Sequence, residues 1–398
     1  MKEPKIRFKG FSGEWNFSNF EEAFSPLKNN SLPRADLSER GDIANIHYGD
    51  VLIKYGECVD TSVDDLTYII DYKTAQRLLR NGALQKGDVI FADAAEDNTV
   101  GKCSELICKD NERIVSGLHT IACRPKLQIT ERYFGYYLNS PAFHNQLLPH
   151  IQGTKISSIS RRAISTTSVL YPDDKGEQKL LASFFTSLDA QISASTSRLA
   201  LLKQMKAASL QTMFPQEGET VPKVRFKGFE GEWKKVKLVD VCYKKASKLS
   251  ESSLGEDIGI YAVFGANGYL QNITTYDMSS KYVGIIKDGS GVGRSKVYPA
   301  FTSLLGTMQY ILPKGHNNIE FIAALFETID FTAFVSGSGI PHIYFKDYCE
   351  LSVMIPDTEE QQSIASFFRS LDRQIALHTQ RLEKLKQIKA ACLDKMFV

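Results

Sequence analysis

The sequence predicts a mixed α/β fold, with two α/β domains separated by two long helices that pack as an antiparallel coiled coil in a pseudo-twofold internal repeat. The first observation is that IRFKGFSGEW at 6–15 returns as VRFKGFEGEW at 224–233. The second is that LASFFTSLDAQI at 181–192 returns as IASFFRSLDRQI at 364–375. The stretches between these repeats differ in both length and sequence. One architecture is therefore expected to present two different surfaces.

Four segments follow from the repeats. A chain of 398 residues exceeds the size at which a single core keeps growing, so more than one domain is expected. We place a first variable domain at 1–170, a first helical spacer at 171–215, a second variable domain at 216–355 and a second helical spacer at 356–398.

The two helical segments share an a/d heptad seam, in which apolar residues recur at steps of four and three. The seam residues are Leu181, Phe185, Leu188, Ile192, Leu199 and Leu202 in the first copy, and Ile364, Phe368, Leu371, Ile375, Leu382 and Leu385 in the second. Polar residues interrupt both copies at matching positions, Ser195 with His378 and Lys206 with Lys389. A lone helix cannot bury such a stripe, so we expect the two helices to pack together. The alternative is that each docks separately on a domain.

Each helix also has a start signal. Asp174-x-x-Glu177 and Asp357-x-x-Glu360 resemble capping boxes, and Phe214-Pro215 is expected to stop the first helix.

The variable domains are expected to share a scaffold. Strand-like runs lie at 88–92, 166–171, 282–286 and 351–355, and helical runs at 131–148 and 319–331. Each domain has a strand that leads to a glycine-containing loop, which ends in Val100-Gly101-Lys102 or Val292-Gly293-Arg294. A later pattern, Gly153-x-x-Ile156-x-x-Ile159 or Gly337-x-x-Ile340-x-x-Ile343, precedes the final strand.

Composition excludes several classes of protein. The hydrophobic fraction is 43%, the charged fraction 24% and the net charge +2. These values are ordinary for a soluble protein and do not decide whether the chain binds nucleic acid. Seven scattered cysteines without a C-x-x-C favour free thiols in a reducing cytosol over a zinc site. No run of 18 apolar residues and no export segment is present, so we expect a cytoplasmic protein without a membrane span.

Motifs for catalysis are missing, and we assign no catalytic or metal-binding residue. The run 288–295 lacks the spacing of a phosphate loop, and the seven histidines form neither HExxH nor a deaminase pattern. The nuclease-like fragment around Pro172-Asp173 lies at a helix start, where capping explains it. A methyltransferase or nuclease within this chain is therefore disfavoured.

Basic residues in the loops are the candidates for DNA contact, because lysine and arginine neutralise phosphates and arginine reads base edges. The candidates are Lys102, Lys155, Arg161 and Arg162 in the first domain and Lys281, Lys287, Arg294 and Lys296 in the second. Each alone is more often a solvated surface charge, so the case depends on their clustering. The loop with Asp93, Glu96 and Asp97 is acidic, which weakens the case for the first domain.

The repeated R-F-K-G-F-x-G-E-W, S-F-F-x-S-L-D-x-Q-I and terminal K-Q-x-K-A-A motifs resemble the DNA-specificity subunit of type I restriction–modification systems over the whole chain. The resemblance implies that the variable domains are target-recognition domains, each reading one half of a bipartite, asymmetric site in double-stranded DNA. It implies a non-catalytic chain without a cofactor of its own. Its partners would be two modification subunits, which carry S-adenosylmethionine and methylate adenine, and the restriction (motor-nuclease) subunits. The alternative is a scaffold of two modules that bind polypeptides.

Overall fold

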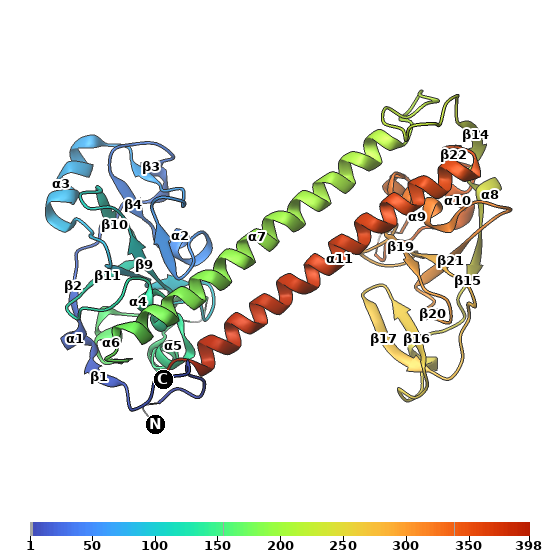
Figure 1. The fold of residues 1–398 in the computed structure, drawn as a ribbon. Coiled ribbons are helices and arrows are strands. Elements are labelled where there is room, and N and C mark those ends of the chain that lie inside the picture. The colour runs from blue at the N-terminus through green and yellow to red at the C-terminus, as the bar shows by residue number, and fades with distance from the viewer. Residues whose placement is uncertain (1–2, 154, 338) are drawn as a thin grey trace. The chain divides into compact units, whose positions relative to one another are not determined.

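The computed structural model describes residues 3–153, 155–337 and 339–398, and the chain divides into two compact units. Unit 1 is formed by Met1–Ala194 with Leu382–Val398, and unit 2 by Ser195–Arg381. Each unit contains a mixed α/β domain and part of both long helices, as the predicted fold class requires (Figure 1). The division into four segments stays a prediction.

Unit 1 is built around a five-stranded sheet with the order β2-β11-β7-β9-β5. Its strands are β2 (Phe24–Pro26), β11 (Thr120–Pro125), β7 (Val89–Ala92), β9 (Cys103–Ile107) and β5 (Cys58–Asp60). Successive side chains of β7 point to opposite faces, as in any strand. Val89 and Phe91 join the core under α4 (Tyr133–Asn139), while Ile90 and Ala92 join the core under α2 (Tyr48–Ile53). Both faces are covered, which explains why β7 is apolar throughout.

Unit 2 repeats this plan with a four-stranded sheet of the order β15-β21-β18-β19. Its strands are β15 (Cys242–Ala246), β21 (Met308–Pro313), β18 (Tyr282–Ile286) and β19 (Ser295–Tyr298). Helix α9 (Ile319–Glu327) covers the face that carries Val283 and Ile285. The opposite face, with Tyr282 and Ile286, packs near a small sheet formed by β17 (Gly268–Ile273), β16 (Tyr261–Gly265) and β20 (Ser303–Leu304).

Unit 1 has a corresponding small sheet and one further helix. The small sheet has the order β10-β4-β6-β3, and α3 (Tyr72–Gly82) follows β6. Its strands are β10 (Ile114–Ser116), β4 (Ala44–Ile46), β6 (Tyr68–Ile69) and β3 (Leu37–Ser38). In both units a parallel strand pair belongs to the small sheet, β10 with β4 and β20 with β16. The two units therefore share the order of four strands in the main sheet and one parallel pair in the small sheet, while β5 and one strand of the small sheet are additional in unit 1.

The expected strands are found, but one expected helix is broken. The runs at 88–92, 166–171, 282–286 and 351–355 contain β7, β13 (Ser168–Tyr171), β18 and β22 (Ser352–Ile355). The helical run at 131–148 is instead divided into α4 and α5 (Pro141–His144). Ser140 between them is extended, with φ −71° and ψ 153°, because proline disfavours a helical conformation in the residue before it.

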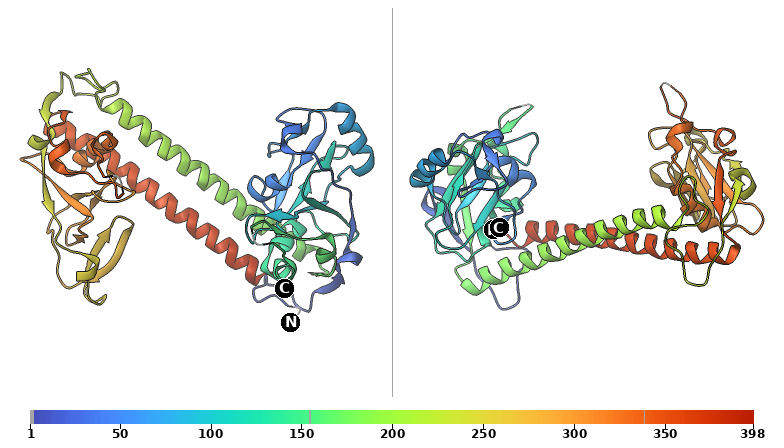
Figure 2. Two further views of the ribbon diagram at one scale, coloured as in Figure 1. Left: turned by 180° about the vertical axis from the view of Figure 1, so that it is seen from behind. Right: turned by 90° about the horizontal axis from the view of Figure 1, so that it is seen from above.

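The long helices α7 (Lys175–Met213) and α11 (Thr358–Lys395) pack antiparallel in each unit. In unit 1 the start of α7 meets the end of α11, and the rings of Phe185 and Phe397 stack with centroids 5.5 Å apart. In unit 2 the chain just after α7 meets the start of α11, with the rings of Phe214 and Phe368 6.1 Å apart. Both views in Figure 2 show these helix ends side by side within unit 2.

The seam residues lie inside this packing. Nine of them are buried: Leu181, Phe185, Leu188, Leu199, Leu202, Ile364, Phe368, Leu371 and Leu382. Ile192, Ile375 and Leu385 are partly buried.

At the starts of the long helices the aspartate of each expected capping box acts as a cap, but the glutamate does not. Asp174 caps α7 by accepting from the Gly176 and Glu177 amides at 2.6 and 3.3 Å, and Asp357 accepts from the Glu360 amide at 2.9 Å. The two glutamates, however, do not reach back to the cap. The Arg7 guanidinium donates to both Glu177 carboxylate oxygens at 2.7 and 2.8 Å.

The second copy is the same, since Arg225 donates to both oxygens of Glu360 at 2.7 Å. Bidentate, charge-assisted bonds of this kind are stronger than a bond from a backbone amide. The repeated R-F-K-G-F arm is thus fastened to the start of each long helix.

Candidate nucleic-acid interface

An exposed pair of the predicted DNA-binding residues, Arg294 and Lys296, lies at the start of strand β19 of unit 2. The glycine-rich turn before it ends at Gly293, which has a left-handed φ of 87° and donates its amide to the Ile286 carbonyl at 2.9 Å. Arg294 and Lys296 follow at alternate positions, and both are exposed. The Arg294 Nε donates to the Gly291 carbonyl at 3.4 Å. Among the described residues neither side chain belongs to an ion pair, so both charges can still meet phosphates or base edges.

The two other predicted cations of unit 2 are paired with carboxylates. The Lys281 amine lies 2.8 Å from the Glu320 carboxylate, which also pairs with the Arg369 guanidinium at 2.8 Å. The Lys287 amine lies 2.5 Å from the carboxylate of the neighbouring Asp288. Their charge is partly neutralised, which makes them weaker candidates than Arg294 and Lys296.

Aromatic rings lie next to β19, beginning with Tyr298, which is itself buried in the core of unit 2. The Lys296 amine lies 5.8 Å from the centre of the Tyr298 ring. Phe264 lies 5.0 Å from Tyr298 and 6.2 Å from Tyr269, with distances between ring centroids. A second row runs from Tyr261 to Tyr276 at 4.8 Å and on to Phe301 at 5.1 Å.

We call these two rows, together with the two cations, the basic–aromatic strip, defined by Arg294, Lys296, Phe264, Tyr269, Tyr261, Tyr276 and Phe301, with Tyr298 buried behind Phe264. In the sequence, Tyr269 and Tyr298 lie near the basic loop, whereas the other rings come from three separate loops and strands and no pattern connects them to it. Stacking rings beside cations are the usual means of holding nucleic acid.

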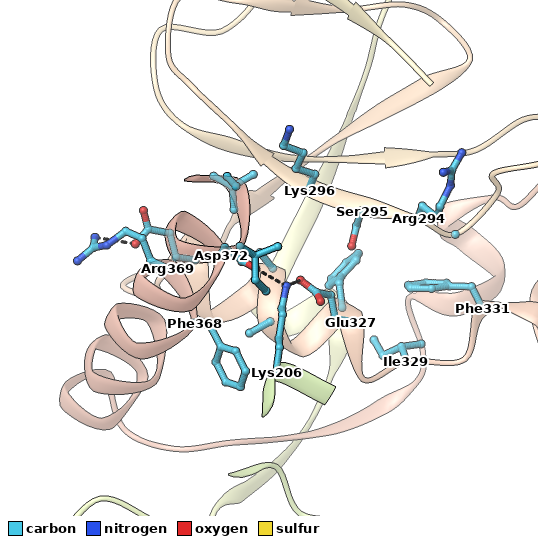
Figure 3. Close-up of a pocket in the computed structure, with 18 of the residues that line it drawn as sticks. Lys206, Arg294, Ser295, Lys296, Glu327, Ile329, Phe331, Phe368, Arg369 and Asp372 are labelled. Atoms are coloured by element: carbon cyan, nitrogen blue, oxygen red, sulfur yellow. Dashed lines mark hydrogen bonds and ion pairs between the residues drawn. The ribbon is translucent and has the colours of Figure 1, made fainter. Parts of the chain in front are cut away.

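A cleft of about 840 Å³ opens beside the strip (Figure 3). It is bounded by β19, α9 and the part of α11 from Phe368 to Ala376. Lys206 of α7 lies in it, with its amine 2.8 Å from Glu327 and 2.6 Å from Asp372. Burial lowers the pKa of Lys206, but the two carboxylates outweigh this effect and raise it overall. In Figure 3 Arg294 and Lys296 point away from the Lys206 amine.

Unit 1 contains the same arrangement of charges. The Lys389 amine of α11 lies 2.6 Å from Glu57 and 2.6 Å from Asp189 of α7, and Asp189 also accepts from the Tyr136 hydroxyl at 2.8 Å. Each set joins α7, α11 and one variable domain, and we call the two sets the ion triads. They explain why lysine interrupts both heptad seams at matching positions.

Lys102 in unit 1 is partly buried and its amine points into the domain, which makes it a weaker candidate for DNA contact than Arg294, although the contact itself stays a prediction. Its amine donates to the carbonyls of Leu52 and Tyr55 at 2.9 and 3.0 Å, at the end of α2, and burial lowers its pKa. The turn before Lys102 is equivalent to the turn before Arg294, because the Gly101 amide donates to the Ala92 carbonyl at 2.9 Å. The same turn thus directs a lysine inward in unit 1 and an arginine outward in unit 2.

The remaining candidates of unit 1 lie at the surface. Lys155, Arg161 and Arg162 are exposed, and Arg161 donates to the Leu27 carbonyl at 2.8 Å. The acidic loop has internal partners, since Asp93 lies 3.0 Å from His119 and Asp97 accepts from the Thr99 amide at 2.9 Å. The predicted basic residues of unit 1 therefore do not form a single surface comparable to the strip.

A polar hollow in unit 1 was not indicated by the sequence. It has a volume of about 440 Å³, and Asn29, Thr74, Arg77 and His119 lie in its wall. These side chains come from α3 and two separate loops, so no linear pattern connects them.

Within the described residues, no group of three or more His, Cys, Asp or Glu side chains could hold a metal ion. No described helix is long and apolar enough to cross a membrane.

The comparisons with known proteins agree with this architecture. The family profile described as type I restriction modification DNA specificity domain matches residues 13–204 and 230–387. The solved structure of the type I restriction–modification S subunit from M. genitalium is similar with a TM-score of 0.70 and 13% identity, over 100% of this chain and 99% of that one. A second solved structure is described as the structural basis of complex assembly and conformational transition of the type I R-M system. Its TM-score is 0.51 and its sequence identity 16%, over 96% of this chain and 97% of that one. Comparison with curated protein sequences gives no match.

Proposed function

The chain belongs to the family of type I restriction–modification DNA specificity subunits, and from this premise we propose that it reads a bipartite, asymmetric site in double-stranded DNA. Each unit would read one half-site. As a specificity subunit the chain recognises DNA and is not itself the enzyme. We further propose that it works in the cytoplasm and directs two modification subunits and the restriction subunits to the site. S-adenosylmethionine would be bound by the modification subunits.

The observation that carries the proposal is one scaffold, present twice, with different chemistry at equivalent positions. The turn before β9 directs Lys102 inward, and the turn before β19 directs Arg294 outward. Two equivalent modules with different surfaces suit two different half-sites. Joining them in one chain converts two modest affinities into one tight interaction when the spacing fits.

The proposal is tested by reconstituting the chain with its modification subunits and mapping the methylated adenines in genomic DNA. We expect one sequence in two parts separated by a fixed spacer. Binding to a duplex with that site should weaken steeply with salt, because phosphate contacts release counterions. A chain that only scaffolds polypeptides would give neither the site nor the salt slope.

The double substitution Arg294→Ala and Lys296→Ala tests the basic part of the strip. We expect weaker binding of the cognate duplex and a salt slope reduced by about 1.8, because two phosphate contacts at about 0.9 each are lost. Lys234→Ala with Lys235→Ala is the matched control, since it removes two exposed cations from β14 (Lys234–Lys237). Equal slopes in the two variants would remove Arg294 and Lys296 from the interface.

A further inference from the structure

Phe301 has a backbone conformation that its residue type rarely adopts. It has a φ of 60°, while its side chain is 51% exposed. A bulky residue in the left-handed region is strained, and such strain persists only where surrounding bonds impose it. Here the Phe301 amide donates to the Met278 carbonyl at 2.7 Å, and the Thr302 hydroxyl donates to the Pro299 carbonyl at 2.7 Å. Glycine or asparagine would fit this turn at less cost.

The exposed Phe301 ring is supported from one side only. It lies edge-on to Tyr276 at 5.1 Å, and Tyr276 lies against Tyr261 at 4.8 Å. Tyr276 is itself 40% exposed, so this row adds little to the core of unit 2. The backbone of Phe301 is therefore strained at a position where it holds an aromatic ring at the surface, in contact with the ring of Tyr276.

The charges around this row are mixed. The carboxylate of Asp277, next to Tyr276, accepts from the hydroxyl of buried Tyr310 at 2.7 Å, although Asp277 itself is exposed. Lys296 of β19 lies five positions before Phe301 in the chain and is exposed as well. An exposed cation that can hold a phosphate and an exposed ring that can stack on a base thus belong to one segment of unit 2.

We propose that Phe301, backed by Tyr276, is a wedge that stacks on or between the bases of the half-site read by unit 2. This inference rests on the proposed function and deepens it. Apolar side chains inserted at a base step unstack it and bend the duplex. The strained turn fixes the backbone that carries the ring before DNA binds, which reduces the conformational entropy lost on binding.

The test uses the full chain reconstituted with its modification subunits and a cognate duplex with 2-aminopurine at successive positions of the half-site. In the parent complex we expect one position, other than the adenine that the modification subunits extrude for methylation, whose fluorescence rises on binding, which reports an unstacked base. Phe301→Gly should abolish this rise and weaken cognate binding by about 5- to 150-fold. The same substitution should leave the melting temperature equal or higher, because glycine relieves the strain at φ 60°.

Two further variants keep the result interpretable. Phe301→Asn tolerates the left-handed backbone without a ring and should behave as Phe301→Gly does. Tyr243→Ala removes an exposed ring from β15, at the opposite edge of the sheet from β19, and should leave both fluorescence and affinity unchanged.

Several outcomes would overturn the wedge. The first is that Phe301→Gly keeps the fluorescence and the affinity of the parent. The second is that this variant loses as much affinity for a non-cognate duplex as for the cognate one. The third is that it fails to assemble with the modification subunits, so that no effect on DNA can be assigned to the ring. A parent complex that bound its mapped site no better than random duplex would instead contradict the proposed function itself.

Discussion

At the scale of single residues, Lys102 differs from Arg294 in its surroundings rather than in its local sequence. Lys102→Met should destabilise unit 1 by about 1–3 kcal/mol, because it removes two hydrogen bonds and leaves the carbonyls of Leu52 and Tyr55 without their donor. Thermal or urea unfolding measures this loss. DNA affinity below the melting range should remain at the parental value. A large loss of affinity in a fully folded variant would show that Lys102 contacts DNA after all.

A buried acid on β9 gives a prediction for pH. Glu105 accepts from the amides of Arg132 and Gly135 at 2.7 and 2.8 Å, yet burial raises its pKa to about 7. Between the ordinary value of 4.5 and about 7, the unfolded chain releases this proton while the folded chain keeps it. The Glu105 contribution to the free energy of unfolding should therefore fall as pH rises, by about 3 kcal/mol in total, and level off above pH 7.

Urea titrations between pH 5 and pH 8 would measure this trend, with Glu105→Gln as the comparison. The glutamine variant should show a flatter profile, because it has no proton to release. The same slope in both proteins would assign the pH dependence to other groups.

Sequence patterns could identify the turn before Lys102 and Arg294 but not the direction of either side chain. The glycine turn is local, and Val-Gly followed by a cation marks it in both units. The inward direction of Lys102 depends on α2, whose carbonyls lie about fifty positions earlier in the chain and have no counterpart in the pattern. The aromatic rings of the strip were missed for the same reason, since Phe264 meets Tyr298, and Tyr276 meets Phe301, only in the folded unit.

At the scale of elements, the ion triads fasten each variable domain to the helical pair. Lys206→Met should destabilise unit 2, because Glu327 and Asp372 would face each other without a cation. We expect about 1–3 kcal/mol, less than for a fully buried pair, since Asp372 is half exposed. The loss, measured by urea unfolding, should shrink toward low pH as Glu327, whose pKa burial raises, takes up a proton. Lys203→Met, which removes an exposed lysine from the same helix, is the control.

Periodicity predicted the long helices well because each repeats one simple rule over many turns. The seam, the aspartate caps and the stop at Phe214-Pro215 are all local or periodic signals. The roles of Glu177 and Glu360 were not local, because their arginine partners lie 170 and 135 positions away. The run at 131–148 was predicted as one helix because the apolar pattern continues across Pro141, although the proline breaks it.

At the scale of the whole molecule, α7 and α11 are the elements shared by both units. Helix α7 is continuous over 39 residues and α11 over 38. Both helices contribute residues to the core of unit 1 and to the core of unit 2. At about 1.5 Å per residue such a helix is about 57 Å long. If each unit reads a half-site, the length of these helices should set the number of base pairs between the half-sites.

Deleting one heptad from each helix tests this. The deletions belong between Asp189 and Lys206 in α7 and between Asp372 and Lys389 in α11, so that both triads stay intact. Seven residues shorten a helix by about 10 Å and rotate its end by only about 20°. That length corresponds to about three base pairs at about 3.4 Å each. Mapping of methylated adenines should therefore show the same two half-sites with a spacer about three base pairs shorter.

Deleting the heptad from α7 alone is the control, because it puts the two seams out of register and should lower stability without defining a new spacer. The half-site sequences are expected to survive the double deletion, since the basic–aromatic strip and its scaffold lie outside the deleted segments. An unchanged spacer in the methylated sites of a folded double-deletion variant would show that the helices do not measure the distance. The spacing would then have to be set by the modification subunits.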